Sequence, residues 1–224
     1  MNYVYAKDGV MPGDFSGYFI FRRFRQMYSR LSDEDRQAII KALDIKDIPK
    51  EDFDPEVLNN LESNEEYQGI LHTFGGDVIA SPEFKKLKEF VQHGNVTVYE
   101  HSIHVALCAI KISKYLGVKC RRRELIRGAL LHDYFLYDWH KGDDPQNLHP
   151  KLHGFYHPGI ALRNAVRDFA LTEREKDIIR KHMWPLTVIP PRCKEAWIVC
   201  MADKYASTLE TLKLKKGKIL VNYA

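Results

Sequence analysis

The adjacent residues His132 and Asp133 carry the strongest chemical signal in this 224-residue chain, because His101 lies upstream of them and Asp203 downstream. Neutral imidazole nitrogen and carboxylate oxygen together suit divalent ions such as Zn²⁺, Fe²⁺ and Mn²⁺, and the carboxylates offset the charge of the ion. An adjacent His-Asp pair alone is common by chance. Two imidazoles and two carboxylates from separate segments predict a metal site if the fold brings them together.

The hydrophobic periodicity predicts a helix over each segment that carries these residues, with the ligands on the apolar faces. The expected helices cover residues 98–116, 122–133 and 193–212. The carboxylates of Asp133 and Asp203 therefore enter apolar surroundings, where an unpartnered charge is costly. A bound metal ion would offset that cost.

Two further histidines extend the candidate set. His157 precedes Pro158, a residue favoured in the first helical turn, so we expect His157 to mark the start of a helix. His182 lies at the end of a helix that Thr172 could cap and that Pro185 terminates. Histidines at helix ends near a pocket mouth are plausible ligands for a second metal ion.

The ligand candidates fall in an ordered series of short motifs, which are E-H-S-I-H-V-A (100–106), L-L-H-D (130–133), H-P-G-I-A (157–161), I-I-R-K-H (178–182) and M-A-D-K (201–204). This series resembles the HD-domain superfamily of metal-dependent phosphohydrolases, in its two-metal version. The resemblance covers about residues 97 to 208. It implies an all-α fold, an HD-domain-like helical bundle with the ligands at its centre.

The resemblance also implies two divalent metal ions, of Fe, Mn, Zn or Mg. The first ion would be held by His101, His132, Asp133 and Asp203, and the second by Asp133, His157 and His182. The chain departs from many two-metal members, which continue the pair with Ile-Gly and a nearby Lys, because residues 134–136 are Tyr, Phe and Leu. The Gly-Tyr-Pro signature of one cyclic-dinucleotide phosphodiesterase branch is also absent, which disfavours that branch.

Two adjacent ions can activate a water molecule, hold a phosphoryl oxygen and stabilise the leaving oxygen. The sequence therefore predicts hydrolysis of a phosphomonoester or phosphodiester bond in a small substrate, with nucleotides among the candidates. Asp133, His104 and Lys204 are the predicted catalytic residues. His104 would donate a proton to the leaving group, and Lys204 would orient the substrate, with Lys181 and Arg123 as weaker candidates.

Two alternatives remain open. Some HD-fold oxygenases, including myo-inositol oxygenase, resemble this pattern of four histidines and two aspartates but hold a redox-active di-iron centre, and ligand type alone does not separate iron from manganese or zinc. The site could instead belong to a non-catalytic metal- or nucleotide-binding sensor module.

The segment from Trp139 to Gly154 contains glycine, aspartate, proline and asparagine, and we expect it to form a loop or lid. His140, His149 and His153 are then expected to be exposed loop residues. Tyr137, Asp138 and Trp139 form a polar-aromatic cluster close to His132 and Asp133 that could line a substrate pocket, whereas core packing is the default interpretation of Trp184.

The composition is that of an ordinary globular protein. The net charge of +4, from 34 basic and 30 acidic residues, is too small to indicate nucleic-acid binding, and the arginines in residues 19–30 are interpreted as a solvated helix face. The four cysteines form no Cys-x-x-Cys motif and are expected to be reduced. No stretch is long and apolar enough to cross a membrane, so we expect a cytoplasmic protein.

We expect one domain over residues 1–224. Residues 96–212 would form the HD metal-binding core, and residues 1–95 a helical extension packed on it. Within the extension, Ser32 and Ser81-Pro82 are predicted helix starts, and a flexible boundary is conceivable near Gly94. The sequence leaves the oligomeric state open.

Overall fold

The computed structural model describes residues 57–139, 153–187 and 189–215. The described chain is mostly helical, which confirms the predicted all-α class. One short antiparallel hairpin interrupts the helices within this part of the chain. The elements are α3 (Val57–Glu62), α4 (Glu65–Ala80), α5 (Pro82–Lys85), the 3₁₀ helix η1 (Lys86–Glu89), β1 (Val91–His93), β2 (Val96–Thr97), α6 (Val98–Tyr115), α7 (Arg122–Leu131), α8 (His153–Asp168), α9 (Glu173–Lys181) and α10 (Lys194–Lys215).

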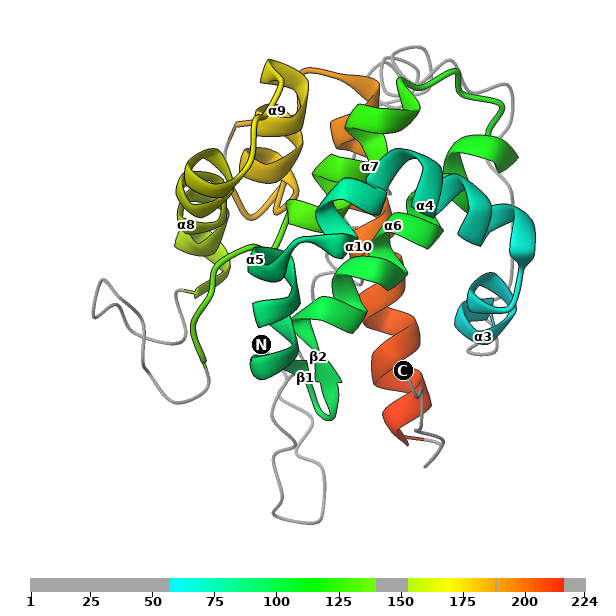
Figure 1. Ribbon diagram of the computed structural model, residues 1–224, viewed down its shortest axis with the longest axis horizontal. Coiled ribbons are helices and arrows are strands. Elements are labelled where there is room, and N and C mark those ends of the chain that lie inside the picture. The colour runs from blue at the N-terminus through cyan, green and yellow to red at the C-terminus, as the bar shows by residue number, and fades with distance from the viewer. Residues whose placement is uncertain (1–56, 140–152, 188, 216–224) are drawn as a thin grey trace, which may run out of the picture.

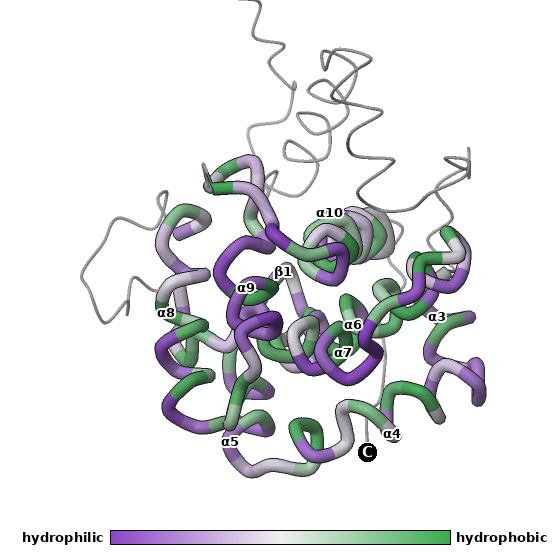
Figure 2. Tube along the Cα trace, turned by 90° about the horizontal axis from the view of Figure 1, so that it is seen from above, coloured by the Kyte–Doolittle hydropathy of each residue, from purple (hydrophilic) through white to green (hydrophobic). Residues whose placement is uncertain are grey.

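Three helices form the centre of the structure. Helix α6 packs against α7 and along α10, while α3 and α4 cover one side and α8 and α9 the other (Figure 1). Every residue of α6 from His101 to Ile110 is buried, so this helix is enclosed on all faces. Hydrophobic stretches of α6 and α7 lie in the interior, and hydrophilic residues recur along the outer helices (Figure 2). This arrangement gives the ligand-bearing segments a common apolar surrounding.

A hairpin leads directly into α6. Strands β1 and β2 pair antiparallel, and Gly94 takes a φ of 57° in the turn between them, a conformation that glycine adopts without steric cost. Gly94 is therefore a tight-turn residue of the hairpin. Thr97 and Glu100 then form a capping box at the start of α6, which places His101 one turn into the helix.

Two further predicted helix starts in the described chain, at Ser81 and Thr172, are confirmed. Ser81 accepts a hydrogen bond from the Phe84 main-chain nitrogen and caps α5, and Thr172 caps α9 through a capping box with Glu175. Helices α3 and α4 pack on α6 and α7. The helix expected after Ser32, the arginine-rich residues 19–30, and His140 and His149 lie outside the described residues.

Two helix boundaries differ from the prediction. Helix α7 ends at Leu131, so Asp133 lies in the turn that follows the helix and not on a helical stripe. Helix α8 begins at His153, four residues before His157, which places Pro158 inside the helix. Pro158 is the sixth residue of α8 and has no N–H to donate, so it removes one hydrogen bond within the helix and does not mark the helix start.

No helix in the described ranges combines the length and the apolar character needed to cross a bilayer.

The approach of α7 to α9 depends on Gly128. A Cβ atom at this position would lie 2.6 Å from Cδ1, 2.8 Å from Cγ2 and 3.0 Å from Cβ of Ile178. Because the contact includes the Cβ of Ile178, a change of rotamer would not relieve it. The two helices carry His132 and His182 at their ends, so this close packing also sets the spacing between two site residues.

Gly128→Ala is therefore expected to lower the free energy of unfolding by about 1–3 kcal/mol, as overpacked core positions do. Gly69→Ala is the matched control, because Gly69 lies in α4 and its Cβ would meet nothing within 4 Å. The control is expected to be neutral or to gain up to about 1 kcal/mol from helix propensity. Urea unfolding of both variants measures this, and equal stabilities would contradict the packing account.

Candidate metal centre

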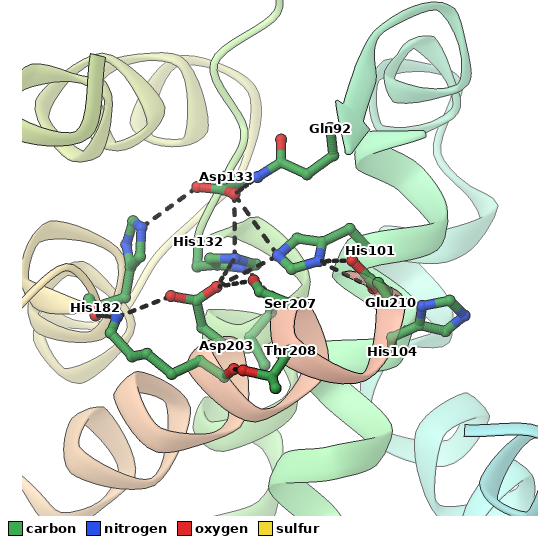
Figure 3. Close-up of polar contacts among 12 residues, drawn as sticks. Gln92, His101, His104, His132, Asp133, His182, Asp203, Ser207, Thr208 and Glu210 are labelled. Carbon is green, nitrogen blue, oxygen red and sulfur yellow. Dashed lines mark hydrogen bonds and ion pairs between the residues drawn. The ribbon is translucent and has the colours of Figure 1, made fainter. Parts of the chain in front are cut away.

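Six residues predicted as metal ligands from the sequence lie around one buried point. His101 comes from α6, His132 and Asp133 from the end of α7, and Asp203 from α10 (Figure 3). His157 lies in α8 and His182 caps the C-terminal end of α9. All six side chains are buried, Asp203 being the most exposed at 7%. The structure thus brings the whole predicted set together.

Each imidazole is held through its Nδ1 atom. His132 Nδ1 lies 2.7 Å from the Ala129 carbonyl oxygen, and His182 Nδ1 lies 2.8 Å from that of Ile179. His157 Nδ1 lies 2.9 Å from the carbonyl oxygen of His153. A carbonyl oxygen only accepts, so Nδ1 carries a proton in these three residues.

His101 follows the same pattern with a carboxylate in place of a carbonyl. Its Nδ1 atom lies 3.0 Å and 3.1 Å from the two carboxylate oxygens of Glu210. All four rings therefore turn Nε2 toward the centre. Metal-binding histidines characteristically donate their second nitrogen to a carboxylate or carbonyl in this way.

The four Nε2 atoms form two groups that share Asp133. In the first group, His132 Nε2 lies 3.3 Å from Asp133 Oδ2, and His101 Nε2 lies 3.9 Å from the same oxygen and 3.4 Å from Asp203 Oδ1. In the second group, His157 Nε2 and His182 Nε2 lie 3.0 Å and 3.3 Å from Asp133 Oδ1. Both groups have the composition and compactness of a metal-binding cluster. Asp133 therefore offers one oxygen to each group.

The donor atoms fit divalent ions. Ligand atoms bound to one ion at about 2.1 Å lie about 3.0–3.4 Å apart, which is close to most of the separations above. His157 Nε2 and His182 Nε2 are only 2.9 Å apart, and each ring directs its Nδ1 atom to a main-chain carbonyl oxygen. Such a contact is stabilised when a proton or a metal ion lies between the two atoms. His132 Nε2 and Asp133 Oδ1 are also buried without a hydrogen-bond partner, as expected for ligand atoms.

The electrostatics favour the charged forms of both carboxylates and the neutral form of His182. Burial opposes ionisation of Asp133, but His132 and His157 hold the pKa of its carboxyl well below the usual value. Burial likewise opposes ionisation of Asp203, and Lys204 is the main group that holds its pKa well below normal. Burial lowers the pKa of His182 to about 4, so this imidazole is neutral at pH 7. The carboxylates are thus charged and His182 can donate its lone pair.

Two residues of the centre were not predicted from the sequence. Gln92 of β1 donates its amide group to Asp133 Oδ2 at 2.7 Å, and Glu210 of α10 holds His101. A glutamine in a three-residue strand gives no periodic signal. Glu210 could have been found, because it follows Asp203 by seven residues, or two helical turns, on an apolar face.

The predicted catalytic residue His104 does not face the centre. Its ring lies on the far side of Glu210 from His101, with Nδ1 2.7 Å from Glu210 Oε1 and Nε2 2.5 Å from Glu62 Oε1 (Figure 3). Residues three apart on a helix are rotated by about 60° around its axis. That rotation turns His104 toward α3, so the structure gives no support for a proton-donor role.

The predicted catalytic residue Lys204 is also differently placed. Its ammonium group donates to the His182 carbonyl oxygen at 2.6 Å and to Asp203 Oδ2 at 2.8 Å, and only 4% of the residue is exposed. Lys204 is therefore placed to hold Asp203, and not to orient a substrate at the mouth. The weaker candidates pair elsewhere, Lys181 with Asp177 and Arg123 with Asp77.

The structure corrects the expectation that His153 is an exposed loop residue. His153 is buried at the start of α8, and its ring stacks between Trp139 and His157, with ring centroids 4.9 Å and 4.6 Å away. The Tyr137 hydroxyl lies 3.0 Å from its Nδ1 atom. His153 and His157 are four residues apart on one helix, so they share a face. The stacked ring of His153 therefore packs against His157, which is a candidate metal ligand.

Trp184 is half-buried and packs edge-on against Trp197, which is itself only partly buried, so the expected core packing is not observed for Trp184.

Residues 98–208 match the protein family described as HD domain. The match begins with α6 and ends within α10, and it includes all six residues around the centre. Together, the match and the His/Asp centre show that the chain belongs to the HD-domain family. Proteins of this family bind divalent metal ions and are mostly metal-dependent hydrolases. No match to this chain was found among curated proteins or among solved structures.

Lys204→Met is expected to destabilise the metal-free protein by about 3 kcal/mol, because it leaves the buried Asp203 carboxylate without its ammonium partner. The lowered pKa of Asp203 means that this stabilisation is present above about pH 4 and is lost as the carboxylate takes up a proton in more acidic solution. The deficit of the variant should therefore shrink as the pH falls below about 4.

Lys176→Met is the matched control, since Lys176 pairs with the exposed Glu173 on α9. Its effect should stay within about 0.5 kcal/mol. Urea unfolding in the presence of a chelator, repeated from pH 7 to pH 3, gives both values. A Lys204→Met deficit no larger than that of the control would show that the ammonium does not hold Asp203.

Proposed function

We propose that this chain is a metal-dependent phosphohydrolase that cleaves a phosphomonoester or phosphodiester bond of a small substrate with two divalent ions. The proposal rests on the position of Asp133, because its two carboxylate oxygens face different pairs of imidazoles. Two ions that share one carboxylate are the arrangement that metal-assisted phosphoryl transfer uses. Membership of a family of mostly metal-dependent hydrolases supports the same class of reaction.

In this proposal His101, His132, Asp133 and Asp203 hold the first ion, and Asp133, His157 and His182 hold the second. We call these sets the first and second groups. An imidazole-rich set without thiolates suits Zn, Fe or Mn better than Mg. When bound, the two ions would supply an activated water molecule and stabilise the charge of the phosphoryl oxygens.

Neighbouring side chains and main-chain groups hold these ligands in position. Gln92 and Lys204 each hold one carboxylate, and the main-chain contacts at Nδ1 fix three of the imidazoles. The buried surroundings lower the local dielectric constant, which strengthens every charge interaction at the centre. We further propose that residues 1–224 act as one functional unit, because Gln92, which holds Asp133, lies in the extension before residue 96.

The experiment that tests the function is anaerobic purification with elemental analysis, followed by phosphate-release and oxygen-consumption assays on the same sample. Hydrolysis of phosphoesters without oxygen uptake is the expected result. Iron-dependent oxygen uptake without phosphate release would instead indicate a di-iron oxygenase built on the same ligands. Full metal loading with neither activity would indicate a sensor module.

Asp133→Asn is expected to reduce the hydrolysis rate by at least about a thousandfold and to lower the content of both ions, because it removes a charged ligand from each group. His157→Ala should preferentially remove the second ion. Asp168→Asn is the control, since this carboxylate contacts Arg167 and Tyr134. Elemental analysis with rate measurements gives the result, and full activity of Asp133→Asn would refute the assignment of Asp133.

A further inference from the structure

A row of buried charged side chains connects α3 with the candidate ligand His101. Glu62 Oε1 lies 2.5 Å from His104 Nε2, and His104 Nδ1 lies 2.7 Å from Glu210 Oε1. Glu210 in turn accepts from His101 Nδ1 at 3.0 Å (Figure 3). His104 and Glu210 are 3% and 1% exposed, and 14% of the Glu62 side chain is accessible. The row therefore begins near the surface and ends at the metal centre.

The geometry determines where the protons lie. Ionised carboxylates only accept hydrogen bonds, and each nitrogen of His104 faces one of them. His104 must therefore donate from both nitrogens, as an imidazolium between Glu62 and Glu210. Opposite charges alternate along the row, so the buried negative charge of Glu210 is balanced on the side away from His101.

This balance controls the orientation of His101. Glu210 fixes the His101 ring only if the Glu210 carboxylate itself stays in place. Of the hydrogen bonds to this carboxylate, the one from His104 is shorter than those from His101. Without His104, a buried carboxylate would lose part of its compensation and would be free to turn. Partners of this kind set the direction and basicity of a metal-bound imidazole, and their loss typically weakens metal binding 10- to 100-fold.

We propose that Glu62 and His104 are positioning residues that set the metal affinity of the first group through Glu210. The second group serves as an internal reference, because His157 and His182 are held by main-chain carbonyl oxygens. Glu62 and Glu210 lie outside the residues that match the family, so the proposal makes α3 part of the metal site. It rests on the proposed function only in treating the first group as a metal site.

Two substitutions at His104 separate the contacts that this residue makes. The amide nitrogen of asparagine occupies nearly the position of Nδ1, so His104→Asn retains a donor to Glu210. The longer glutamine places its amide near Nε2, so His104→Gln retains a donor to Glu62 and loses the one to Glu210. Both variants remove the charge and they differ from each other by one methylene group, which makes each a control for the other.

The test is calorimetric titration of the chelator-treated full chain with Zn²⁺, with thermal unfolding of the metal-free proteins as a check on folding. His104→Gln is expected to weaken one of the two Zn²⁺ equivalents about 10- to 100-fold and to leave the other unchanged. His104→Asn should bind that equivalent more tightly than His104→Gln but more weakly than the wild type, because it keeps the donor to Glu210 and loses the charge and the contact to Glu62. Equal affinities in both variants, whether reduced or unchanged, would overturn the role of the Glu210 contact.

Glu62→Gln tests the outer end of the row even if the His104 variants fold poorly, since Glu62 is accessible to solvent. It should weaken the same Zn²⁺ equivalent, whereas Glu66→Gln should not, because Glu66 pairs with the exposed Lys114. Wild-type affinity in Glu62→Gln would overturn the part assigned to Glu62. A wild-type chain that binds two Zn²⁺ ions without hydrolysing phosphoesters would contradict only the proposed function, and one that binds none would contradict both.

Discussion

The orientation of four buried imidazoles is the constraint on which the rest of the site depends. Each ring is held through Nδ1, and each therefore presents Nε2 to the carboxylate of Asp133, with His101 and His132 also facing Asp203. Imidazoles that turn Nε2 toward one point require positive charge there, either as protons on the rings or as bound metal ions. The folded chain thus stabilises a set of donors that is favourable only with positive charge at its centre, and divalent ions satisfy this requirement better than protons because they bind several donors at once.

The surrounding fold supplies the acceptors that impose this orientation. His132 and His182 follow the last residues of α7 and α9, and their rings turn back to carbonyl oxygens of the final helical turn, which have no partner further along the helix. His157 uses the same kind of carbonyl within α8. Only His101 depends on a side chain, Glu210, and this difference makes the first group sensitive to residues far from it in the sequence.

The sequence was sufficient to predict the helical class and the six central residues, because ligand types and apolar periodicity are local properties. It failed where a side chain's direction depends on tertiary packing. His104 has the right type and spacing for the site, but the turn of α6 directs it toward Glu62. His153 lies in a composition typical of loops, yet the aromatic ring of Trp139 and the face of α8 bury it. Gln92 could not be predicted, since its position depends on a hairpin packed against the helices.

The central claim is that two ions share Asp133. Anomalous diffraction at the zinc absorption edge, from crystals of the full chain grown with Zn²⁺, tests it most directly. The account predicts two peaks, one bounded by the Nε2 atoms of His101 and His132 and the other by those of His157 and His182, with an oxygen of Asp133 as a ligand of each. A single peak, or peaks away from Asp133, would contradict it.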